Sequence, residues 1–96
     1  MEQENTVVID DEFGLILNCA VRYTIGRMTY MPSSVIRYIT PLLDKLDDKT
    51  VDVFIQDIER YQKDVERGVG SWGFECDRED WLTFLSRCKV EMGRRK

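Results

Sequence analysis

The sequence predicts an all-α fold, a small bundle of about four helices with a proline-interrupted second helix, in a single domain over residues 1–96. Apolar residues recur at intervals of three and four along most of the chain, which is the spacing of amphipathic helices. Capping residues, prolines and glycines divide this pattern into four segments. The composition, 43% hydrophobic and 33% charged, is typical of a globular domain rather than a disordered chain.

The first predicted helix begins at Asp10 or Asp11, because acids favour a helix start, and it ends at Gly26 as a left-handed C′ residue. Residues 1–8 before it are expected to be flexible. Its predicted buried stripe follows helical spacing and consists of Phe13, Ile16, Leu17, Ala20 and Tyr23, widened by Leu15, Cys19 and Val21. The width of this stripe predicts that the helix is central, with the others packed around it.

The second and third predicted helices have clear boundaries. Pro32 suits the first turn of the second helix, because its missing N–H has no partner there, and Pro41 interrupts the pattern. The third helix is expected to start at Asp47 or Asp48 and to end at Gly68.

A glycine-rich loop over residues 68–74 separates the third helix from the last. Its aromatics, Trp72 and Phe74, either cover the core or face a partner. Asp77 is expected to cap the last helix. The core predicted from the last two helices includes Phe54, Trp81, Phe84, Leu85, Cys88 and Met92.

The residue inventory excludes several classes of enzyme. Histidine is absent, and none of the three cysteines belongs to a C-x-x-C pair, so the usual zinc spacings and the Ser–His and Cys–His nucleophile pairs are missing. We therefore expect no enzymatic activity, no metal, no cofactor and free thiols in a reducing compartment. The polar, acidic start does not resemble a secretory signal, and no apolar run approaches the ~20 residues of a membrane span. A cytoplasmic location is expected.

Charge is unevenly distributed along this chain, whose net charge is −4. Residues 17–42 hold three arginines and no acid, whereas residues 43–66 hold eight acids and four bases. Two candidate partner-binding surfaces follow. One is an Arg/Tyr set with Arg22, Arg27, Tyr30 and Arg37, and the other is an acidic set with Asp48, Asp52 and Asp57.

Both surfaces have more than one interpretation. Arginine and tyrosine are frequent at protein-interface hot spots, and they also contact phosphates and stack on bases. Alternatively, Arg22 pairs with an acid of the third helix while Tyr23 and Tyr38 lie in the core. The acids are a solvated helix start, a metal or acid–base pair, or a surface that docks on a basic protein groove. We expect the Arg/Tyr set to converge on one corner, with Arg27 and Tyr30 as anchors.

The segment from Cys19 to Met31 carries a resemblance to a known family. Its pattern is Cys-Ala-x-Arg-Tyr, then aliphatic-Gly-Arg-x-Thr-Tyr, and Asp-Ile-Glu-Arg follows at residues 57–60. It resembles small uncharacterised proteins encoded by phages and other mobile elements of bacteria, over about the middle half of the chain. Small acidic phage proteins are often inhibitors of host defence, including anti-CRISPR proteins. The resemblance therefore implies a bacterial host cytoplasm and a partner such as a CRISPR effector nuclease.

These observations together predict a non-enzymatic protein-binding module. The specific interpretation is a phage-encoded, anti-CRISPR-like inhibitor of a bacterial defence nuclease. The alternative is a nucleic-acid-binding accessory protein that uses the Arg/Tyr patch, although a uniform nucleic-acid binder is basic overall and this chain is acidic. A metal-dependent hydrolase built on the acids is disfavoured by the lack of histidine.

Overall fold

The computed structural model describes residues 9–96. Within that range the chain forms helices and no strand: α1 (Asp11–Thr24), α2 (Met31–Ile39), the 3-10 helix η1 (Thr40–Lys45), α3 (Asp48–Glu66) and α4 (Glu75–Arg94). The predicted all-α bundle of four helices is confirmed. The expected flexible segment, residues 1–8, lies outside the described residues.

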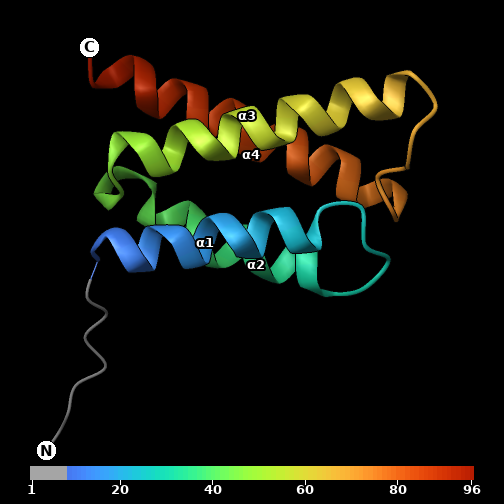
Figure 1. Ribbon diagram of the computed structural model, residues 1–96, viewed down its shortest axis with the longest axis horizontal. Helices are drawn as coiled ribbons and strands as arrows, with labels where there is room; N and C mark the ends of the chain where they lie inside the picture. Colours follow the sequence, from blue (N-terminus) through green and yellow to red (C-terminus); the bar gives the residue numbers. More distant parts are fainter. Residues whose placement is uncertain (1–8) are drawn as a thin grey trace, which may run out of the picture.

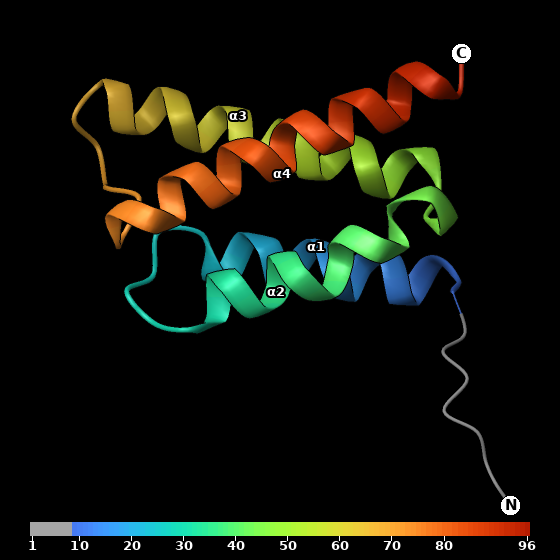
Figure 2. The same ribbon diagram turned by 180° about the vertical axis from the view of Figure 1, so that it is seen from behind.

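Two helical hairpins, α1–α2 and α3–α4, pack against each other (Figures 1 and 2). The loops inside both hairpins lie at one end of the bundle, and η1 lies at the other end with the end of α4. Helix α1 packs on α2 and α3, while α4 packs on α3, α2 and η1. The prediction that the first helix is central is therefore wrong, because α1 occupies one corner of a four-helix arrangement.

The helix starts follow the predicted capping chemistry at two of three positions. The side chain of Asp10 accepts the Phe13 N–H at 2.9 Å, and that of Asp47 accepts the Thr50 N–H at 3.0 Å. Hydrogen bonds from the Thr50 side chain and from the Thr50 backbone N–H hold the pKa of Asp47 below its usual range.

The predicted start of the last helix is wrong. Helix α4 begins at Glu75 after Phe74, which places Asp77 at the third helical position rather than at the cap. From there the carboxylate of Asp77 accepts the N–H of Phe74 at 3.3 Å. An acid three residues into a helix can thus bond back to the start of that helix, and sequence alone does not separate this arrangement from a cap.

Both prolines have their predicted effects on the second helix. Pro32 lies in the first turn of α2. The α-helix gives way at Thr40 to η1, whose first turn contains Pro41. The Thr40 hydroxyl bonds back to the Ile36 carbonyl at 2.7 Å, so Thr40 closes α2 and does not cap η1.

The core lies between the two hairpins and contains the predicted aromatics of α3 and α4. Phe54, Trp81 and Phe84 are at most 1% exposed. The ring centroids of Phe54 and Phe84 are 5.6 Å apart, and those of Trp81 and Phe84 are 6.2 Å apart in an edge-on arrangement. The prediction of these three core residues is confirmed.

Helix α1 is rotated relative to its predicted buried stripe. Its buried residues are Gly14, Leu17, Asn18, Val21 and Thr24, whereas Ile16 and Tyr23 are 63% and 56% exposed. The contact with α3 explains the rotation, because a Cβ on Gly14 would overlap the Thr50 side chain. Beside it, Asn18 Nδ2 donates to the Thr50 carbonyl at 3.1 Å. A glycine and an asparagine therefore face the neighbouring helix, and larger apolar side chains face solvent.

Candidate protein-binding site

The loop between α1 and α2 begins at Gly26, which has a positive φ of 84° as predicted. A Cβ at this position would overlap the Tyr61 side chain. Gly73, in the loop between α3 and α4, also has a positive φ, and a Cβ there would lie 2.9 Å from the Arg27 carbonyl oxygen. The two loops therefore meet backbone to backbone at their glycines.

The α3–α4 loop packs against the α1–α2 loop (Figure 1). Trp72 is buried and packs edge-on against Tyr61, with ring centroids 5.4 Å apart. The Tyr61 hydroxyl donates to the Ser71 carbonyl. Phe74 is 44% exposed. Of the two interpretations of this loop, Trp72 covers the core, whereas Phe74 faces solvent.

Residues 27–31, here called the loop tip, present large side chains to solvent. Tyr30 is 90% exposed, Met28 63% and Met31 44%. The Arg27 guanidinium lies 4.4 Å from the centroid of the Tyr23 ring, and its Nε donates to the Tyr23 carbonyl at 3.0 Å. Sequence reasoning singled out Arg27 and Tyr30 but missed Met28, which is frequent at interfaces and carries no charge signal.

Arg22 and Asp57, predicted on different candidate surfaces, bind each other. Arg22 Nε and a terminal nitrogen lie 3.1 and 3.0 Å from the same Asp57 oxygen. Arg60 approaches the other oxygen at 3.5 Å. The Asp57 side chain is only 7% exposed, so it is held in this ion pair between α1 and α3 and is not presented to solvent.

The Arg/Tyr set converges only in part. Arg22, Tyr23 and Arg27 line one shallow hollow at the end of α1, and the loop tip follows directly. Arg37 lies in the last turn of α2, at the far end of that helix from the loop. The expected convergence of Arg37 with the other three is wrong, because six residues of helix separate it from the start of α2.

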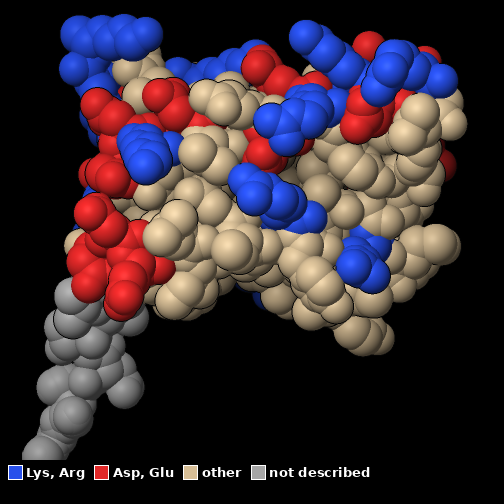
Figure 3. Space-filling model, in the orientation of Figure 1, with Lys and Arg blue, Asp and Glu red and all other residues tan. Residues whose placement is uncertain are grey.

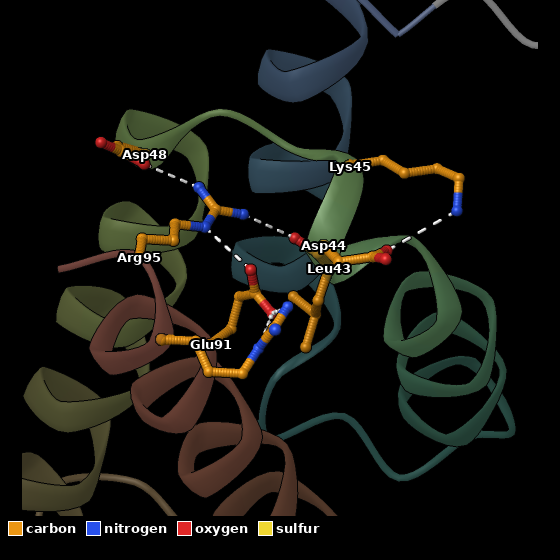
Figure 4. A network of polar contacts seen from close by, with 7 residues as sticks. Leu43, Asp44, Lys45, Asp48, Glu91 and Arg95 are labelled. Carbon is orange, nitrogen blue, oxygen red and sulfur yellow. Dashed lines mark hydrogen bonds and ion pairs between the residues drawn. The ribbon is translucent and has the colours of Figure 1, made fainter.

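The acidic set is divided as well. Asp48 binds Arg95 at 2.7 Å, and Asp52 is exposed, with no ion pair to any residue in the described range. Arg95 also donates to the Leu43 carbonyl at 2.8 Å and to Glu91 at 2.9 Å (Figure 4). One guanidinium thus joins α3, η1 and α4, and we call these contacts the Arg95 network.

Glu91 is a second centre of the Arg95 network. It is buried at 8% exposure, and Arg94 binds its other oxygen at 3.1 Å. The hydrogen bond from Arg95, assisted by Arg94, holds the pKa of the Glu91 carboxyl below its usual range. Sequence reasoning missed Glu91, although its spacing of three and four residues from two arginines is the spacing of helical ion pairs.

Comparison with protein-family models, with curated proteins and with solved structures finds no match for this chain.

Residues 9–96 contain no group of three or more histidine, cysteine, aspartate or glutamate side chains placed to hold a metal ion. Cys19 and Cys76 are exposed free thiols, whereas burial raises the pKa of the Cys88 thiol to about 12. None of the described helices has the length and apolar character of a membrane span.

Proposed function

We propose that this protein is a non-enzymatic protein-binding module, specifically a phage-encoded inhibitor of a bacterial defence nuclease such as a CRISPR effector. The observation that carries the proposal is the loop tip, where Tyr30, Met28 and Arg27 are presented together on a fixed turn. Tyrosine, methionine and arginine are enriched at protein interfaces, and tyrosine and arginine are frequent at binding hot spots.

The contacts that hold the base of the loop tip in place favour binding of a partner. Gly26 and Gly73 hold the base of the loop against a neighbouring backbone, and Tyr61 packs under it. Such a loop loses little conformational entropy when a partner binds, and preorganisation of this kind raises affinity.

The phage origin and the class of partner come from the sequence resemblance. The motif from Cys19 to Met31 maps onto the second half of α1 and the whole loop tip. Residues that give the family its pattern therefore include those with the greatest exposure, and exposed loop residues more often serve binding than folding.

Nucleic-acid binding is the alternative function. Three arginines in an acid-free segment favour it, but Arg22 is neutralised by Asp57 and Arg37 lies apart from Arg27. Each neutralised phosphate adds about one unit to the salt dependence of binding, so the remaining isolated charges support only weak attachment.

A phage-plating experiment tests the proposal. Cells that carry a CRISPR effector and a matching spacer are expected to restrict phage, and expression of this protein is expected to restore plaques. The joint substitution Met28→Ser and Tyr30→Ala is expected to abolish the rescue while the melting temperature stays unchanged. Val69→Ser, which alters an apolar residue of the α3–α4 loop that is 56% exposed, is the control and is expected to retain the rescue.

Two outcomes contradict the proposal. One is a failure to rescue plating against effectors of every type tried. The other is a shift of a labelled oligonucleotide that is lost with Arg27→Ala and decreases steeply with salt, which supports the nucleic-acid alternative.

A further inference from the structure

Helix α1 has a second apolar face that no described helix covers. Leu15, Ile16 and Tyr23 are 60%, 63% and 56% exposed, and Cys19 is exposed beside them. Positions 12, 16, 19 and 23 are separated by four, three and four residues, which is the spacing of the contact positions in a coiled coil. We call Glu12, Ile16, Cys19 and Tyr23 the α1 seam.

The α1 seam has opposite charges at its two ends. Asp11 and Glu12 lie in the first turn of α1, and neither forms an ion pair with another residue between positions 9 and 96. At the other end Arg22 is paired with Asp57, and the basic group at the seam is Arg27, which lies over the Tyr23 ring. Figure 3 shows this order along the helix: acidic side chains where α1 begins, an uncharged surface in the middle and basic side chains toward its end.

We propose that the α1 seam binds the α1 seam of a second copy of this chain, as an antiparallel, two-fold symmetric dimer. In a two-fold interface the same patch occurs on both subunits and must be self-complementary. An antiparallel pairing centred between positions 17 and 18 satisfies this condition. It places Glu12 opposite Tyr23 of the second copy, and Ile16 opposite Cys19 of the second copy.

Charge and size both match in this pairing. Glu12 meets the Arg27 guanidinium that lies over Tyr23 of the second copy, and the same contact recurs at the other end of the seam. In the middle, the large side chain of Ile16 faces the small one of Cys19, so the two helices can interdigitate. A parallel pairing instead places Glu12 against Glu12, which is unfavourable.

The choice of a second copy over a different protein follows from this balance. The α1 seam has acidic groups at one end and a basic group at the other, so a second copy in the reversed direction presents the opposite charge at each end. A surface that binds a different acidic or basic protein needs only one sign of charge. One helix per subunit buries a small area, so the dimer belongs to the weak, reversible class. Met28 and Tyr30, which the plating experiment replaces, lie beyond the seam, and Glu12, which the dimer experiment replaces, lies outside the loop tip. Only Arg27 belongs to both surfaces, so these other residues test the proposed function and the dimer separately.

A charge-swap experiment tests the dimer. Wild-type protein is expected to change from monomer to dimer between about 1 µM and about 1 mM in sedimentation equilibrium, the range of weak complexes. Glu12→Arg alone and Arg27→Glu alone are each expected to raise the dissociation constant at least about tenfold, because like charges then meet at both ends. Arg37→Glu, the same charge change on α2, is the matched control and is expected to have no effect.

The decisive sample is an equimolar mixture of the two charge-reversed chains. In their heterodimer the new arginine of one chain meets the new glutamate of the other, and the second contact keeps the native pair. Association is therefore expected to return to near the wild-type level. A monomeric wild type at the highest concentration, or a mixture that associates no better than its components, overturns the proposal.

Cross-linking through Cys19 gives an independent measurement. Two Cys19 residues in this pairing are offset by about 4.5 Å along the helix axis, at a rise of about 1.5 Å per residue. A short bis-maleimide is expected to join two copies of a Cys76→Ser chain, and Ile16→Arg in the same chain is expected to prevent it. Buried Cys88 remains unreactive. If a Cys19→Ser chain that retains Cys76 cross-links as efficiently as the Cys76→Ser chain, the assignment of the dimer interface to α1 is overturned.

Discussion

At the scale of single residues, the contacts among Phe54, Trp81 and Phe84 anchor α3 to α4. Each ring is almost fully removed from water, and Phe84 touches both of the others. The indole N–H of Trp81 finds no acceptor within the described residues, so this side chain stabilises the core through packing alone. Phe84 is thus the ring that links the other two.

Truncation of this central ring is the first prediction. Phe84→Ala is expected to lower the free energy of unfolding by about 3–5 kcal/mol, since a buried aromatic leaves a cavity. A small domain has a total free energy of unfolding of roughly 5–15 kcal/mol, so this substitution removes a large part of the stability of the fold. Urea denaturation followed by circular dichroism measures the change. Thr83→Ala, at the exposed neighbouring position, is expected to change it by less than about 0.5 kcal/mol.

At the scale of secondary-structure elements, the rotation of α1 separates its buried side from its exposed apolar side. Gly14 lets the helix approach α3, and Asn18 fixes the register by its bond to the Thr50 carbonyl. The rotation exposes Ile16 and Tyr23, which form the middle and one end of the α1 seam.

The two helical glycines of the chain give a matched pair of substitutions. Gly14→Ala is expected to lower the melting temperature, because its Cβ overlaps Thr50 and overpacking of this kind costs about 1–3 kcal/mol. Gly93→Ala, in open space near the end of α4, is expected to be neutral or to stabilise by up to about 1 kcal/mol. Thermal melts of both variants check the pair, and equal shifts in the same direction contradict the proposed α1–α3 contact.

The contact between α1 and α3 could not be predicted from the sequence, whereas much of the rest of the fold could. Helix number, both proline effects and the φ of Gly26 follow from local chemistry, so periodicity and capping predict them well. Helix α1 carries apolar residues around most of its circumference, and periodicity then does not select the buried side. The choice depends on a glycine and an asparagine that fit one neighbouring helix, which is a tertiary property.

The candidate site likewise has a part that the sequence predicts and a part that depends on tertiary packing. Exposure of Arg27 and Tyr30 follows from their position in a loop. The pairing of Arg22 with Asp57 joins residues 35 positions apart, and pairings this distant depend on how α1 lies against α3. Charge composition places these two residues on different surfaces, whereas the alternative interpretation, in which Arg22 pairs with an acid of the third helix, is confirmed. The core positions that this alternative gives to Tyr23 and Tyr38 are wrong, because these side chains are 56% and 51% exposed.

At the scale of the whole molecule, the Arg95 network closes the end of the bundle opposite the two loops. It connects α4 to the start of α3 and to η1 through a single side chain (Figure 4). Because the Glu91 carboxylate at its centre is buried and ionised, the stability of this end depends on pH.

The sign of that dependence follows from the lowered pKa of Glu91. A carboxyl group whose pKa is lower in the folded state stabilises the fold fully above its usual value, about 4.5, and this contribution is lost as the pH falls through the folded pKa. Glu91→Gln is therefore expected to lower the melting temperature near neutral pH, and the deficit is expected to narrow toward about pH 3. Asp44→Asn, at an exposed acid, is the control. A deficit that does not change with pH contradicts the assignment.

The contact between Gly26 and Gly73 also constrains how this fold can vary in length. Surface loops usually accept inserted residues at little entropic cost. Here an insertion next to either glycine separates two backbones that touch, whereas an insertion between Met28 and Tyr30 lengthens only the exposed tip. The loop of the bundle can therefore change in length and sequence at this position without any change to the core, and the position is suited to grafting a new segment.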